Sequence, residues 1–211
     1  MEKYHLYIVL TRTNTFISKA IHLLKNDEYT HAAISLDREL NQMYSFGRKH
    51  TRNPFVGRFK KEAVNQGVYM LCKNVPSVVI EISVTKQQYE KVKLIIEHFI
   101  RNNNLYKYNY IGLLFSIFQI SVYHDYRFLC SEFVYYILNE NGIIDFKTPR
   151  SLVRPQNFLN IKGRITYIGN LNDIDRIEQQ EPLLGKRHGA SLSLSNAVKQ
   201  GIQTLYTWLQ I

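Results

Sequence analysis

The segment that most constrains the fold is residues 128–142, FLCSEFVYYILNENG. Its apolar residues recur at the spacing of an α-helix, at Phe133, Tyr136 and Ile137. We therefore predict a buried helix that begins at Cys130. The unpaired N–H groups and the dipole at the start of a helix favour a thiolate over a thiol. Cys130 is thus a candidate nucleophile if a base lies nearby.

Segments with alternating, β-branched and aromatic residues predict strands on both sides of this helix. The predicted strands are 4–11, 30–36, 42–47, 68–73, 78–83 and 164–170. The predicted helices are 16–24, 86–102 and 109–120, the last of them buried. Irregular loops are predicted over 48–67, which is basic, and over 148–160. The strands 30–36 and 42–47, joined by a tight loop, are predicted to form a hairpin.

The composition changes near residue 174, where polar residues with glycine and proline begin. We predict one domain over 1–173, a polar linker or mobile loop over 174–192, and an amphipathic helix over 193–211. The apolar stripe of that last helix is interpreted as docking on the domain's own surface. A partner protein or a membrane surface is the alternative.

The chain carries a net charge of +10, which favours solubility or the binding of an anionic partner. Basic residues cluster within the predicted loop, so we expect an anionic surface to bind at the basic loop 47–61. The clusters are not accompanied by helix-turn-helix spacing, a zinc knuckle or an RNA-binding signature. The sequence therefore contains no specific nucleic-acid motif.

The two cysteines, Cys72 and Cys130, form no CxxC motif. This argues against a disulfide framework or a zinc site, and no metal or organic cofactor is expected. The first residues lack the long apolar region of a signal peptide, and the longest apolar run, 110–122, is too short to span a bilayer. We expect a cytoplasmic protein with no transmembrane segment.

His31 differs from the other histidines because it lies within a predicted strand. One face of that strand is apolar, whereas the face of His31 carries only the small residues Ala33 and Ser35. Small neighbours leave room for a group to approach the imidazole. His31 is therefore the candidate base for Cys130.

The predicted hairpin adds a polar residue to this pair. If Tyr44 and Phe46 lie on the apolar face, Ala33 lies opposite Ser45, and Ser45 is diagonal to His31. A hydroxyl in that position can hydrogen-bond to the imidazole and orient it. Each of the three also has an ordinary structural explanation: a small buried hydrophobe for the cysteine, a hydrogen-bonded core histidine, and a strand serine.

Four stretches, in order along the chain, resemble the circularly permuted papain-like cysteine hydrolases, the NlpC-like group of the YiiX type: THAAISLD, MYSFGRK, FLCSEFVYYIL and PRSLVRPQNF. The resemblance covers residues 4–170 and has the histidine strand before the cysteine helix, the reverse of papain. It implies an α+β fold in which an antiparallel sheet packs against the cysteine-bearing helix. It also implies a Cys130–His31 pair with a third polar residue on the strand after the histidine.

At the third position the family usually carries a charged residue, an amide or an imidazole, whereas this chain has Ser45. Glu62, which follows the basic segment, is an alternative. Glu132 is better explained as an acidic residue that complements the helix dipole.

The resemblance implies a cysteine hydrolase or acyltransferase that cleaves an amide or ester bond through a thioacyl intermediate. Proteins of this group act on peptide amides, cell-wall peptides or lipid acyl groups, so a peptide, amide or lipid-acyl substrate is expected. The alternative is a non-catalytic binding module of the same fold that docks an anionic partner or a membrane surface.

Overall fold

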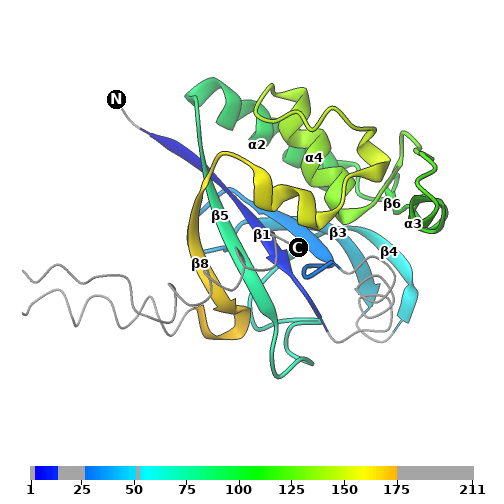
Figure 1. Ribbon diagram of the computed structural model, residues 1–211, viewed down its shortest axis with the longest axis horizontal. Helices are drawn as coiled ribbons and strands as arrows, with labels where there is room; N and C mark the ends of the chain where they lie inside the picture. Colours follow the sequence, from blue (N-terminus) through cyan, green and yellow to red (C-terminus); the bar gives the residue numbers. More distant parts are fainter. Residues whose placement is uncertain (1–2, 14–26, 51–52, 175–211) are drawn as a thin grey trace, which may run out of the picture. The chain divides into compact units, whose positions relative to one another are not determined.

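The structure, a computed structural model, describes residues 3–13, 27–50 and 53–174 (Figure 1). The side chains of residues 48–50 and 53–56 are not described. The predicted helix 16–24, the predicted helix 193–211 and the predicted linker beyond Ile174 lie outside the described residues.

A six-stranded sheet forms the centre of the described fold. In spatial order its strands are β4 (Asn53–Glu62), β3 (Met43–His50), β2 (His31–Ser35), β1 (Tyr4–Thr11), β5 (Pro76–Val84) and β8 (Arg164–Asn170). All neighbouring pairs are antiparallel. A second, two-stranded parallel sheet joins β6 (Lys107–Tyr108) to β7 (Arg127–Phe128). With the helices, this arrangement makes the fold α+β.

Two of the helices, α2 (Lys86–Arg101) and α4 (Cys130–Glu140), cover one face of the sheet (Figure 1). The first of them begins where predicted, because the Thr85 side chain accepts a hydrogen bond from the Gln88 N–H at 3.1 Å. A third helix, α3 (Tyr110–Ile117), begins at Asn109. The 3₁₀ helices are η1 (Arg150–Leu152), η2 (Pro155–Asn160) and η3 (Leu171–Asp173), so the predicted loop 148–160 is more regular than expected.

Alternation along the strands divides the buried residues between the two faces of the sheet. Leu6 and Ile8 of β1 lie in a core between the sheet and the helices, together with Phe133 of α4. Tyr7 and Val9 lie in a second core on the opposite face, under the turns of residues 63–75. A sheet covered on both faces explains why strands such as β1 are apolar almost throughout.

The hairpin formed by β2 and β3 has the predicted register. Ile34 pairs with Tyr44, and the same register would place Ala33 opposite Ser45. Ile34, Tyr44 and Phe46 all belong to the core on the helix side. The predicted faces of both strands are therefore confirmed. The small-residue face of β2 is not open, however, because Ala33 is fully buried in the second core.

The predicted basic loop over 48–67, which includes most of the segment 47–61, is wrong. This segment continues β3 to His50 and then forms β4, the edge strand of the sheet. Phe59 pairs with Phe46 and is buried, so the strand is anchored by one apolar side chain. Proline and glycine are tolerated in an edge strand, which is why turn-like composition was misleading here.

The predicted strand over 68–73 is also wrong, because these residues form turns. Tyr69 and Cys72 are buried beneath them, whereas Met70 and Leu71 are 68% and 63% exposed. The predicted strands 78–83 and 164–170 correspond to β5 and β8 and are confirmed.

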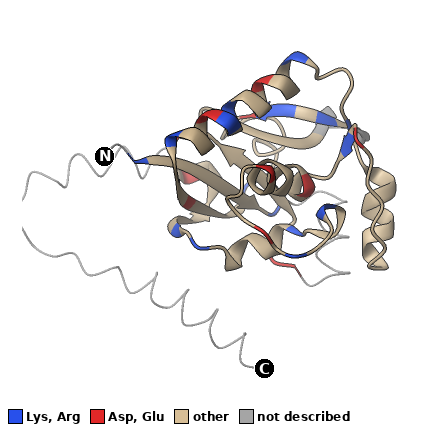
Figure 2. Ribbon diagram, turned by 90° about the horizontal axis from the view of Figure 1, so that it is seen from above, with Lys and Arg blue, Asp and Glu red and all other residues tan. Residues whose placement is uncertain are grey.

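The helix α3 exists, but the prediction that it is buried is wrong. Ile111 and Leu114 are exposed, as is Phe118 at its C-terminal end. Figure 2 shows α3 at the right as a helix without acidic or basic residues. In the described part of the chain, no helix is long and apolar enough to cross a membrane.

Candidate active site

The candidate nucleophile, Cys130, is the first residue of α4 and is only 6% exposed. A residue of the helix itself stabilises its start, because Glu132 Oε2 accepts a hydrogen bond from the Leu129 N–H at 3.1 Å. The sulfur lies against the backbone of Ala32 and Ser131. Cys130 is therefore held between the start of α4 and the start of β2.

His31 is the first residue of β2, and the Cys130 side chain lies beside its imidazole, close enough to act on its charge. Its side chain is 19% exposed, so one part of the ring remains reachable from solvent. The two residues are 99 positions apart in the chain, and the packing of α4 against β2 brings them together. The structure thus unites the predicted nucleophile with the predicted base.

Glu62, the last residue of β4, completes the group. His31 Nε2 lies 3.2 Å from both carboxylate oxygens of Glu62. The carboxylate is 3% exposed and also receives hydrogen bonds from Ser45 Oγ at 2.8 Å and Tyr69 OH at 2.7 Å. Lys60 Nζ lies 3.0 Å from the same carboxylate. Four donors therefore converge on one buried carboxylate.

Ser45 lies in the site, but its hydroxyl donates to Glu62. The direct Ser45–His31 hydrogen bond expected from the sequence is replaced by a contact through the carboxylate. Glu62, the alternative third residue, occupies the orienting position because β4 pairs with β3 and brings its end beside Ser45. Within residues 57–62 only Phe59 is apolar, so the sequence contained no alternating pattern that would have revealed this strand.

The charges of the group depend on one another. Burial disfavours the imidazolium, but the carboxylate of Glu62 and the thiolate of Cys130 outweigh burial and raise the pKa of His31 to about 10. Burial also opposes the ionisation of Glu62, yet His31 and Lys60 hold the pKa of Glu62 well below its ordinary value.

The pKa of the Cys130 thiol also depends on its neighbours. Burial would raise its pKa, but the His31 imidazolium and the backbone N–H donors at Ala32 and Ser131 lower the pKa of Cys130 below its ordinary value. At neutral pH the arrangement therefore favours a Cys130 thiolate, a His31 imidazolium and a Glu62 carboxylate.

Tyr108 of β6 is a member of the site that the sequence reasoning missed. Its side chain lies beside Cys130, and burial together with the Cys130 charge raises the pKa of Tyr108, so the hydroxyl keeps its proton. The ring fits because residue 57 is glycine: a Cβ there would lie 2.6 Å from Tyr108 Cβ. No pattern in the sequence distinguishes Tyr108 from the chain's other tyrosines.

Glu132 is fully buried in the first turn of α4. Arg150 Nε donates to its Oε1 at 3.1 Å, and the guanidinium also lies over the rings of Tyr123 and Phe128. Burial is the largest influence and raises the pKa of Glu132 despite this partner. Glu132 thus anchors the helix start, the role expected for it.

Cys72 is a free, buried cysteine in the turns that cover the second core. The prediction that it lies in a strand is wrong, because residues 68–73 form turns. Among the described residues, no group of three or more His, Cys, Asp or Glu side chains is arranged to hold a metal ion.

Comparison with known proteins does not identify the chain. No family model matches it, and neither does any curated protein or solved structure.

Replacing Ser45 with alanine is expected to have a small effect on Cys130. The change removes one of four donors from Glu62, and a neutral hydrogen bond contributes about 1 kcal/mol, or at most about tenfold in a rate. The measurement is the rate of Cys130 alkylation by iodoacetamide at pH 6, with the exposed Ser83→Ala as the control. A loss as large as that caused by removing His31 would contradict this ranking.

Proposed function

We propose that the chain is a cysteine hydrolase or acyltransferase of the permuted papain-like kind, acting on an amide or ester bond. The observation that carries the proposal is that His31 lies beside Cys130 and is hydrogen-bonded to the Glu62 carboxylate, with the cysteine at a helix start. A nucleophile, a base and a group that orients the base are the parts that acyl transfer by a thiol requires.

The chemistry follows from the positions of these groups. The Cys130 thiolate attacks the carbonyl carbon, and the new S–C bond places a negative charge on the carbonyl oxygen. Backbone N–H groups at the start of α4 and the Tyr108 hydroxyl are the nearby donors for that oxyanion. His31 then donates its proton to the leaving nitrogen or oxygen as the carbonyl re-forms, leaving a thioacyl intermediate.

The second half of the cycle uses the same histidine in the opposite direction. Neutral His31 takes a proton from water, or from an acceptor alcohol or amine, which attacks the thioester. The Cys130 thiolate leaves, and the acid or the transferred acyl product is released. Glu62 stabilises the imidazolium in both halves by holding Nε2.

The order and placement of the elements support a permuted papain-like relationship. His31 precedes Cys130, and α4 packs against the antiparallel strands β2 and β3. The third group lies one strand later than the resemblance implied, on β4. Because the donor to His31 is a buried carboxylate, the chain has a stronger orienting group than Ser45 alone would provide.

The non-catalytic binding module, the alternative from the sequence, was favoured by the lack of a strong third residue. That reason does not apply to a site containing Glu62. That alternative also relied on the basic segment 47–61. Most of this segment lies in the hydrogen-bonded strands β3 and β4 and is not a free loop.

The pH dependence of labelling tests the proposal. Because the pKa of Cys130 is lowered, we expect iodoacetamide labelling of Cys130 to fall off, as the pH is lowered, at a lower pH than the labelling of an ordinary cysteine in a short peptide. Mass spectrometry of tryptic peptides measures the rate, with Cys72 as the internal control.

At high pH, the turnover of an acyl ester should depend on pH differently from the labelling of Cys130. The pKa of His31 is about 10, so proton donation by the imidazolium, and with it turnover, should decline as the pH rises through that value. Cys130 labelling should not decline there, because the thiolate persists. A Cys130 labelling rate that falls over the same pH range as that of a cysteine in a short peptide would contradict the proposed ion pair.

A further inference from the structure

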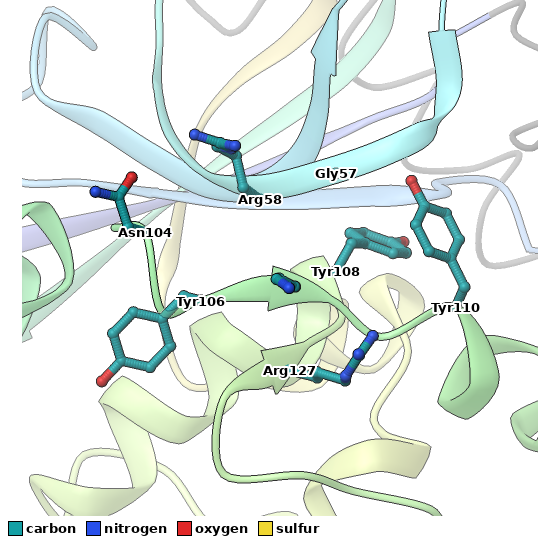
Figure 3. Close-up of a pocket in the computed structure, with 8 residues that line it drawn as sticks. Gly57, Arg58, Asn104, Tyr106, Tyr108, Tyr110 and Arg127 are labelled. Atoms are coloured by element: carbon teal, nitrogen blue, oxygen red, sulfur yellow. The ribbon is translucent and has the colours of Figure 1, made fainter. Parts of the chain in front are cut away.

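A pocket of about 210 Å³ lies between β4 and the small sheet of β6 and β7. Figure 3 shows Arg58 on the β4 side, with Tyr108 and Arg127 on the other side. Lys107, the neighbour of Tyr108 in β6, also lines the pocket. Three cationic side chains from three strands therefore surround one hollow.

The residues that line this pocket include no aspartate or glutamate. Some arginines elsewhere in the described chain do have a carboxylate partner: Arg150 pairs with Glu132, and Arg164 with Glu81. Within the described part of the chain, no carboxylate forms an ion pair with any of the three pocket cations. Three cationic side chains that line one pocket without a counter-charge repel one another. Packing alone therefore does not explain why they lie together.

The pocket adjoins the candidate nucleophile. Tyr108 lines the pocket, and the same side chain lies beside Cys130. Tyr106 and Tyr110 line it as well and add aromatic surface, whereas the Tyr106 hydroxyl lies against His98. A group held in the pocket is thus separated from the reacting sulfur by one tyrosine side chain.

We propose that this pocket binds an anionic group, a carboxylate or a phosphate, on the substrate whose acyl bond Cys130 attacks. This inference rests on the proposed function. Guanidinium groups bind carboxylate and phosphate through paired hydrogen bonds, and an ammonium adds a point charge. The substrate is therefore an amide or ester with a negative charge close to the scissile bond. The anion-binding surface is this pocket, to which the segment 47–61 contributes Gly57 and Arg58.

Two alkylating reagents of nearly equal size test the pocket. Iodoacetate is anionic and iodoacetamide is neutral, so the ratio of their rates at Cys130 reports the local preference for an anion. The double variant Lys107→Ala/Arg127→Ala is expected to lower this ratio about tenfold. The control Lys91→Ala/Lys93→Ala removes the same charge from exposed positions on α2 and is expected to leave it within about twofold.

A binding measurement separates this inference from the proposed catalysis. The full chain with Cys130→Ala is titrated with methyl phosphate, followed by phosphorus NMR. The pocket variant in this background is expected to bind at least about tenfold more weakly than the α2 control. Arg58→Gln, on the opposite wall, is expected to weaken binding as well, which guards against a local folding defect at β7.

The labelling and binding experiments distinguish a failure of the proposed catalysis from a failure of the pocket inference. If Cys130 is not activated, both reagents react slowly with the unaltered protein, yet their ratio and the methyl phosphate affinity still report the pocket. An equal fall of the ratio in the pocket and control variants would mean that only net charge matters and would overturn the inference. Methyl phosphate affinities that do not differ between those variants would overturn it too.

Discussion

Replacing His31 with alanine is expected to slow the alkylation of Cys130 by iodoacetamide at pH 6 by roughly tenfold to a hundredfold. Without the imidazolium, burial leaves the thiol pKa at or above its ordinary value of about 8.5, so only a small fraction is thiolate at pH 6. A thiolate of higher pKa is more nucleophilic, which recovers part of the loss. Time-resolved mass spectrometry of the Cys130 peptide measures the effect.

The matched control is His5→Ala, which removes a histidine that pairs with Glu81 on another part of the sheet. Its Cys130 labelling rate should equal that of the unaltered protein. The buried Cys72 should remain slow in all three proteins, which shows that the variants are folded. Equal labelling of His31→Ala and His5→Ala would remove the support for an activated nucleophile.

Local signals in the sequence were sufficient for several elements. The cysteine helix is amphipathic at helical spacing, and α2 begins at Thr85 with its capping partner Gln88. In the β2–β3 hairpin, a one-residue shift would have moved Ile34, Tyr44 and Phe46 out of the helix-side core, so the register could be predicted. These elements were predictable because their own residues contain the information.

The missed features depend on contacts between distant segments. β4 has the composition of a loop and becomes a strand because it pairs with β3. Glu62 joins His31 only through that pairing. The exposure of α3 was not predictable from its apolar residues, because apolar helices of this length are ordinarily buried. The basic pocket likewise needs three strands that are not adjacent in the chain.

Replacing Glu62 with glutamine is expected to lower the free energy of unfolding by about 3 kcal/mol, because it removes one partner of a buried charge pair. The four groups around the carboxylate are all donors: His31, Ser45, Tyr69 and Lys60. A glutamine offers one acceptor oxygen and adds its own donors, so several of these contacts lose their acceptor.

The loss should depend on pH in a defined way. The pKa of Glu62 is lowered from 4.5, so its contribution is present above that value and is lost as the pH falls through the folded-state pKa. The pKa of His31 is raised from 6.5 to about 10, so its contribution is complete below 6.5 and is lost as the pH rises through about 10. The difference between the two proteins should therefore be largest between pH 4.5 and pH 6.5.

Urea unfolding at pH 5.5 and at pH 10.5 measures this difference, with Glu90→Gln on the exposed side of α2 as the control. The same Glu62→Gln protein should label more slowly at Cys130, because a His31 without its carboxylate has a lower pKa and stabilises the thiolate less. A variant as stable as Glu90→Gln at pH 5.5 would mean that desolvation of the carboxylate cancels its four contacts. Unchanged labelling would assign the orientation of His31 to another group.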